Sequence, residues 1–177
     1  MLASASTVSV VADLLRKHKL SSSVVDPVRD IEHISRVGTD TVKVMVATSG
    51  AQLLPENAIE TLCTQLLPET LLLTPNVPEA KLIAQRGGKS VTEVRNLEGL
   101  EQLASAVHQL GPRYVLLKGG HTPLTSDHQV AKSDDEKQIV VNVLHGEGVT
   151  EVFETQYQRS RNTHGTGCSL ACRSSTL

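Results

Sequence analysis

The pattern of apolar and polar positions along the chain predicts helices that alternate with short apolar strands. Apolar side chains recur three and four residues apart in four segments, a spacing typical of one buried helix face. These segments are residues 4–18, 55–67, 76–85 and 96–110. Short apolar runs that predict strands lie at residues 23–26, 44–50, 70–74, 114–121, 139–144 and 149–153. Alternating strands and helices that end in a β-hairpin predict a three-layer α/β fold with a mainly parallel central sheet.

Polar and charged residues follow several of the predicted strands. Asp26 comes directly before Pro27, Asn76 and Glu79 follow the strand at residues 70–74, and Lys118 precedes Gly119. In open α/β sheets ligands bind at the carboxyl ends of the strands, so these residues are candidates for a binding site. Each also has a structural interpretation. Asp26 would cap a turn, Lys118 would be an edge residue with its ammonium in water, and Asn76 with Glu79 would form a helix capping box, which is the favoured local interpretation.

A glycine-rich turn, Gly165-Thr166-Gly167-Cys168, lies near the end of the sequence and precedes a segment that could begin a helix. Backbone N–H groups at the start of a helix can surround an anion, and glycine allows the backbone to approach it closely. A thiolate is also favoured at a helix N-terminus. A plain glycine turn that caps a helix is the more frequent explanation of four such residues, so the motif alone is a weak signal.

The composition of the chain argues against nucleic acids and membranes as binding partners. The 177 residues carry a net charge of −2, and aromatic residues make up 2% of the chain. Such a chain has neither the basic surface nor the stacking side chains of a nucleic-acid-binding protein. No apolar run is long enough to cross a bilayer, so a cytosolic protein is expected and no membrane partner. Three cysteines without a C-x-x-C spacing argue against a disulfide framework and a zinc site.

Five motifs occur in a specific order: Asp26-Pro27-Val28, the V-A-T-S-G run at residues 46–50, T-P-N-V-P-E at 74–79, L-L-K-G-G-H at 116–121 and N-T-H-G-T-G-C at 162–168. This order resembles that of the hydroxymethylpyrimidine and phosphomethylpyrimidine kinases of thiamine biosynthesis, members of the ribokinase-like superfamily. The resemblance covers nearly the whole chain, residues 1–177, as one partial domain. It implies a ribokinase-like three-layer α/β/α sandwich that is incomplete, with ATP and Mg²⁺ as cofactors and a pyrimidine alcohol or its monophosphate as substrate.

The resemblance also implies roles for individual residues. Catalysis would involve the anion hole Gly165, Thr166 and Gly167, with Cys168 as the base that deprotonates the substrate hydroxyl. ATP would be bound by Asn76, Glu79, Lys118, Gly119 and Thr163. Mg²⁺ would be organised by Asp26 and Glu79, and the pyrimidine would lie near Met1, Val44 and Val46. Phosphoryl transfer depends mainly on positioning and charge neutralisation, which suits this set of residues.

The sequence also departs from the family pattern. Residues 29–43 are polar, have no regular period and interrupt the D-P-V-M-V pattern, so we interpret them as an insertion. The first strands of the family precede the position of Met1, and its helices after Cys168 are cut short. We therefore expect little turnover from this chain by itself. Alternatives are an inactive fragment that binds nucleotide or a partner, and pyridoxal kinase activity; a homodimer is a further expectation from the resemblance.

Overall fold

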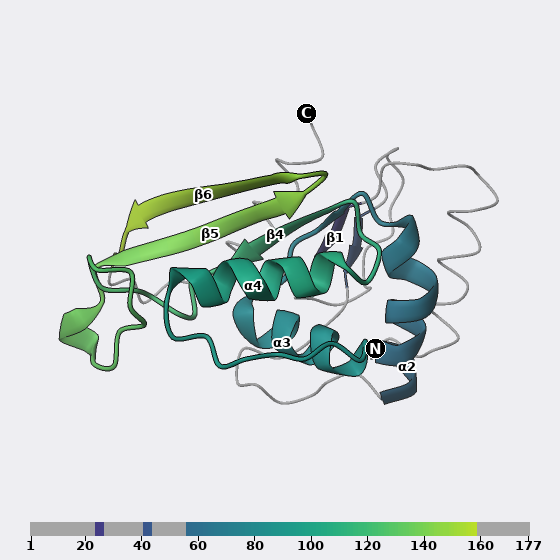
Figure 1. Ribbon diagram of the computed structural model, residues 1–177, viewed down its shortest axis with the longest axis horizontal. Helices are drawn as coiled ribbons and strands as arrows, with labels where there is room; N and C mark the ends of the chain where they lie inside the picture. Colours follow the sequence, from purple (N-terminus) through teal and green to yellow (C-terminus); the bar gives the residue numbers. More distant parts are fainter. Residues whose placement is uncertain (1–23, 27–40, 44–55, 159–177) are drawn as a thin grey trace.

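The computed structural model describes residues 24–26, 41–43 and 56–158, which form a mixed sheet with helices packed against it (Figure 1). The strands are β1 (Val24–Asp26), β2 (Thr41–Lys43), β3 (Leu72–Leu73), β4 (Tyr114–Lys118), β5 (Ile139–Gly146) and β6 (Val149–Gln156). The helices are α2 (Glu56–Thr61), α3 (Val77–Arg86) and α4 (Leu97–His108), with short helical turns η1 (Leu62–Leu66), η2 (Leu67–Glu69) and η3 (Asp134–Glu136). The predicted alternation of strands and helices is confirmed over these residues.

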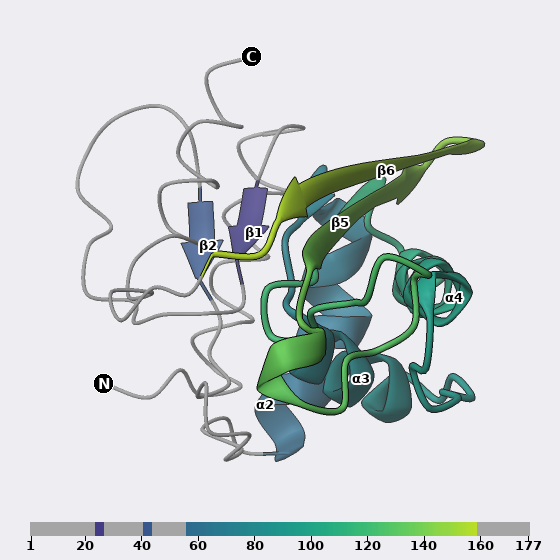
Figure 2. The same cartoon turned by 90° about the vertical axis from the view of Figure 1, so that its left-hand side faces the viewer.

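The sheet has the strand order β2-β1-β3-β4-β5-β6. The first four strands in this order are parallel, and β5 and β6 are antiparallel to their neighbours. Figure 2 shows β1 and β2 side by side and the hairpin of β5 and β6 beyond them. The steps from β2 to β3 and from β3 to β4 run in the same direction across the sheet, so right-handed crossovers place α2, α3 and α4 on one face. The second helical layer expected for a three-layer fold is not among the described residues.

Helices α3 and α4 begin at asparagine N-caps, at the positions where the sequence pattern predicts the two helices to start. The side chain of Asn76 accepts a hydrogen bond from the Glu79 N–H at 2.9 Å, and that of Asn96 accepts one from the Gly99 N–H at 3.0 Å. Each bond satisfies a backbone donor that the first helical turn leaves without a partner. The expected helix starts are therefore confirmed, and both helices carry their apolar residues toward the sheet.

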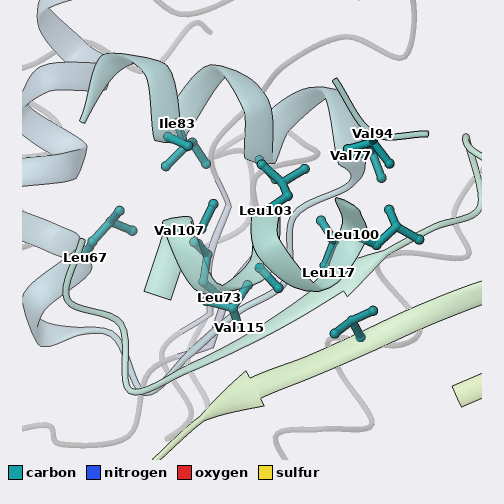
Figure 3. Packing of buried hydrophobic residues seen from close by; sticks show 14 of the residues in the cluster. Leu67, Leu73, Val77, Ile83, Val94, Leu100, Leu103, Val107, Val115 and Leu117 are labelled. Carbon is teal, nitrogen blue, oxygen red and sulfur yellow. The ribbon is translucent and has the colours of Figure 1, made fainter. Parts of the chain in front are cut away.

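The core lies between α3, α4 and the inner face of β3, β4 and β5 (Figure 3). Alternate strand residues point into it, so Val115 and Leu117 of β4 are fully buried while their neighbours are half-buried. From the helices, Leu100 and Val107 are likewise fully buried. Helix α4 runs alongside β4 and β5 and packs its buried apolar face against both strands (Figure 1).

The helix predicted over residues 55–67 is less regular than its pattern indicates. Helix α2 continues as a π-helical turn, η1, and then as a 3-10 turn, η2. Pro68 lies at the start of η2, and a proline cannot continue an α-helical ladder because it has no N–H and its ring meets the carbonyl four residues earlier. The hydrogen-bonding pattern therefore changes before Pro68, although the apolar face remains buried.

Several strand boundaries differ from the prediction, and β5 and β6 extend two and three residues beyond the predicted ends at residues 144 and 153. The strand expected at residues 70–74 is reduced to Leu72–Leu73, because the chain turns through Pro75 into the cap of α3. The strand expected over residues 114–121 ends at Lys118, where a glycine turn begins. Strand β2 occupies Thr41–Lys43, within the range 29–43 predicted as an insertion. Its β-branched Thr41 and Val42 suit a strand, so a short local signal was missed in a polar segment; the insertion itself stays a prediction.

Candidate functional site

Three candidate residues come together at the carboxyl edge of the parallel strands. Asp26 is the last residue of β1, and β1 pairs with β3. Beyond β3, Asn76 forms an isolated parallel bridge with Lys118, and the Lys118 N–H donates to the Pro75 carbonyl at 2.8 Å. The order β1-β3-β4 thus places an acid, an amide and a cation on successive strand ends. The predicted positions at strand ends agree with the structure, and the roles of these residues in binding stay predictions.

The Asn76 and Glu79 pair forms a complete capping box. The Glu79 Oε2 atom accepts a hydrogen bond from the Asn76 N–H at 2.8 Å, in addition to the bond from the Glu79 N–H to Asn76 Oδ1. Glu79 is fully buried and Asn76 nearly so. The local interpretation as a cap is therefore confirmed. The fold itself fixes the position of the Glu79 carboxylate at the N-terminus of α3, where the helix dipole favours negative charge.

Beyond Lys118 the chain makes a tight turn over residues 119–122. The Thr122 N–H donates to the Gly119 carbonyl at 2.8 Å. A Cβ atom at Gly119 would lie 1.9 Å from the Val141 carbonyl oxygen, so only glycine fits between β4 and β5 here. Gly119 is buried, whereas Gly120 and His121 are exposed at the corner of the turn. The turn therefore presents exposed backbone next to the Lys118 side chain.

The surroundings of His121 disfavour protonation of its imidazole. Partial burial and the nearby Lys118 charge both lower the pKa of His121 below its ordinary value. A polyphosphate bound at this turn would act in the opposite direction, because its negative charge favours the protonated imidazole.

The donor set at this edge is chemically suited to Mg²⁺. Magnesium binds oxygen ligands and keeps several waters, usually with one or two protein carboxylates. Glu79 supplies a buried carboxylate at the start of α3, although its Oε2 atom already accepts the cap hydrogen bond, and Asp26 is the last residue of β1. Among the described residues no three acidic, histidine or cysteine side chains form a cluster that would hold a metal by themselves. The residues thus fit a hydrated ion that is also bound by phosphate oxygens.

The remaining predicted site residues lie outside the described part of the chain. They are Thr163, Gly165, Thr166, Gly167 and Cys168 of the glycine-rich turn, and Met1, Val44 and Val46 of the predicted pyrimidine pocket. Their roles as anion hole, base and substrate contacts stay predictions.

One residue at the edge was not found from the sequence. Asn142 of β5 pairs with Lys118 in the β4–β5 ladder, and its Oδ1 atom accepts a hydrogen bond from the Gly119 N–H at 3.2 Å. The only local signal is an amide side chain within the apolar run Val-Val-Asn-Val-Leu. Such a signal does not reveal the partner, which lies 23 residues earlier in the chain.

The fold places the chain in a class of proteins: it is a ribokinase-like α/β protein, with polar residues at the carboxyl ends of its parallel strands. A solved Bacillus subtilis pyridoxal kinase in complex with ADP superposes with a TM-score of 0.65 over 97% of this chain and 52% of that chain, at 23% identity. The phosphomethylpyrimidine kinase of Clostridium difficile superposes with a TM-score of 0.60 over 86% of this chain and 51% of that chain, at 27% identity. The predicted fold class is thereby confirmed.

The sequence comparisons identify the family. The profile of the family described as phosphomethylpyrimidine kinase matches residues 1–175, and the chain belongs to that family. A putative hydroxymethylpyrimidine/phosphomethylpyrimidine kinase of Schizosaccharomyces pombe is 37% identical over 97% of this chain and 28% of its own length. The hydroxymethylpyrimidine/phosphomethylpyrimidine kinase of Salmonella typhimurium is 33% identical over 100% of this chain and 54% of its own. The chain thus spans between about a quarter and about half of these relatives.

The described helices do not include a membrane-spanning one. None of them combines the length and the apolar character that a bilayer crossing requires.

Proposed function

We propose that the protein transfers the γ-phosphoryl group of ATP to 4-amino-5-hydroxymethyl-2-methylpyrimidine and then to the monophosphate of this compound, as in thiamine biosynthesis. Membership in the phosphomethylpyrimidine kinase family supports the reaction. The observation that carries the nucleotide part of the proposal is the placement of Asp26, the Asn76–Glu79 cap and Lys118 on adjoining strand ends. An acid pair with a lysine and an exposed glycine turn suits a magnesium-bound polyphosphate.

In this proposal each residue at the edge has a distinct task. The Lys118 ammonium, together with the backbone of Gly119 and Gly120, would bind phosphate oxygens. Mg²⁺, when bound through waters to Asp26 and Glu79, would neutralise the charge that develops during transfer. Glu79 would also hold the first turn of α3 in place through its bond to the Asn76 N–H.

The acceptor side of the reaction rests on the sequence motif. Cys168 would take the proton from the substrate hydroxyl, and the Gly165–Gly167 turn would bind the transferred group. Met1, Val44 and Val46 would contact the pyrimidine. A homodimer and a cytosolic location complete the proposal.

The second candidate function is phosphorylation of pyridoxal. The solved structures that share this fold include a pyridoxal kinase as well as a phosphomethylpyrimidine kinase. The family match and the sequence identity of the relatives favour the pyrimidine.

Incubation of the purified protein with Mg²⁺, ATP and each acceptor tests the proposal. Products from the free pyrimidine alcohol, its monophosphate and pyridoxal are measured by liquid chromatography and mass spectrometry, and ATP affinity is measured by calorimetry. We expect ATP binding, with product from the two pyrimidines in excess of pyridoxal phosphate. Since the chain spans about half or less of its relatives' length, turnover is expected to be low and binding is the primary readout. Absence of ATP binding would contradict the proposal.

A further inference from the structure

The side chain of Asn142 joins β5 to the glycine turn at the end of β4. Asn142 lies opposite Lys118 in the antiparallel ladder, and its Oδ1 atom accepts the Gly119 N–H at 3.2 Å. Strand β5 is held on both sides, by β4 and by the full length of β6. The amide oxygen is therefore attached to one of the firmly paired strands of the described sheet.

Gly119 is held at both of its backbone polar groups. Its N–H is bound by the Asn142 side chain, and its carbonyl accepts from the Thr122 N–H at 2.8 Å. On its third side the Val141 carbonyl lies so close that a Cβ would meet it at 1.9 Å. These contacts leave little freedom for the direction in which the chain leaves β4.

We propose that Asn142 is a positioning residue for ATP, which fixes the turn over residues 119–122 so that Lys118 and the exposed Gly120 face the phosphates. This inference rests on the proposed function. Asn142 acts through the Gly119 N–H and does not itself contact the nucleotide.

The residue type at position 142 also supports a positioning role. Asparagine is among the residues disfavoured in strands, and its neighbours in β5 are the buried Val141 and Val143. A buried N–H group that loses its hydrogen-bond acceptor lowers the stability of the protein by about 1–3 kcal/mol. The Asn142 oxygen prevents this loss where the backbone ladder between β4 and β5 ends.

Three variants test the inference in the full 177-residue chain. Asn142→Leu keeps the size of the side chain and removes the acceptor, whereas Asn142→Asp keeps an acceptor oxygen. Leu144→Ala is the matched control, because Leu144 is half-buried on the same face of β5 and lies two residues away, opposite Leu116. For each protein, ATP and adenosine affinities are measured by NMR titration, amide exchange is measured at Gly119, and stability by urea unfolding.

We expect Asn142→Leu to weaken ATP binding about tenfold, which corresponds to about 1.4 kcal/mol, with adenosine binding unchanged. Exchange of the Gly119 amide should rise by about the same factor, and Asn142→Asp should restore its protection. Leu144→Ala should lower stability and leave ATP affinity within twofold.

Several outcomes would overturn the inference. If Asn142→Leu retains the wild-type ATP affinity or the wild-type exchange rate at Gly119, the positioning role is wrong while the proposed function stands. An equal loss of ATP and adenosine affinity would show a general structural effect and would also overturn it. If the wild-type protein itself does not bind ATP, the proposed function fails and the inference fails with it.

Discussion

The two glycines that follow Lys118 differ in what a methyl group would meet, and this difference yields a sharp prediction. In Gly119→Ala the new Cβ would lie 1.9 Å from the Val141 carbonyl oxygen, whereas ordinary contact begins at about 3.4 Å. One of the two backbones must therefore move by about 1.5 Å. Since β5 is paired with β4 and β6, we expect the turn to move rather than the strand.

The expected cost follows from this forced displacement. Overpacking of a tightly packed position typically destabilises a protein by about 1–3 kcal/mol, and about 2 kcal/mol changes the unfolding equilibrium constant by up to about thirtyfold. Gly120→Ala is the matched control, because nothing lies within 4 Å of its Cβ position and the residue is exposed. We expect this variant to stay within about 0.5 kcal/mol of the wild type.

Urea unfolding followed by circular dichroism gives the free energy of unfolding, and calorimetry gives ATP affinity. Gly119→Ala should lose both stability and ATP affinity, whereas Gly120→Ala should keep its stability. The reasoning would be refuted if Gly119→Ala matched Gly120→Ala in free energy of unfolding, because the close approach of β5 would then have no energetic consequence.

Two further predictions concern the caps and the histidines. Asn76→Ala and Asn96→Ala each remove a helix cap, and each should lower the free energy of unfolding by about 0.5–2 kcal/mol in a urea titration. Only Asn76→Ala should also weaken ATP binding. If the two variants bound ATP with equal affinity, a ligand role for the Asn76 cap would be contradicted. Burial and the neighbouring His108 lower the pKa of His145, against a smaller opposing effect of Glu101. The unfolded state then binds more protons, so the free energy of unfolding should fall as pH decreases from 7.5 through the ordinary histidine pKa of about 6.5. His145→Gln should flatten this pH dependence. If the substitution left the slope unchanged, His145 would not be its source.

Local signals in the sequence were sufficient for the helix starts and the hairpin. Asn76 and Asn96 act as caps within four residues of the groups they bind. The hairpin loop consists of Glu147 and Gly148, both with positive φ, 47° and 79°, as a type I′ turn requires. Each of these features depends on residues close together in the chain, which is why pattern and turn chemistry predict them.

Features that depend on register between distant segments were not predictable in the same way. The bond from Gly119 to Asn142 exists only because β4 and β5 pair with Lys118 opposite Asn142. A shift of one residue would move the amide to the other face of the sheet. The need for glycine at position 119 likewise follows from the approach of the Val141 carbonyl. The sequence motif identified the turn, but neither of the contacts that hold it.

The candidate site is therefore organised from two sides by different means. On the side of β3, the Asn76–Glu79 cap is local, and its fully buried carboxylate is oriented by the helix before any ligand binds. On the side of β5, tertiary pairing supplies the Asn142 acceptor for the turn that follows Lys118. Groups that are oriented in advance need little rearrangement when a charged ligand binds. Substitutions in the cap should consequently act through the first turn of α3, whereas substitutions at Asn142 should act through the placement of the turn over residues 119–122. Because Asn76 and Asn142 both pair with Lys118, the two effects on ATP affinity should not be additive.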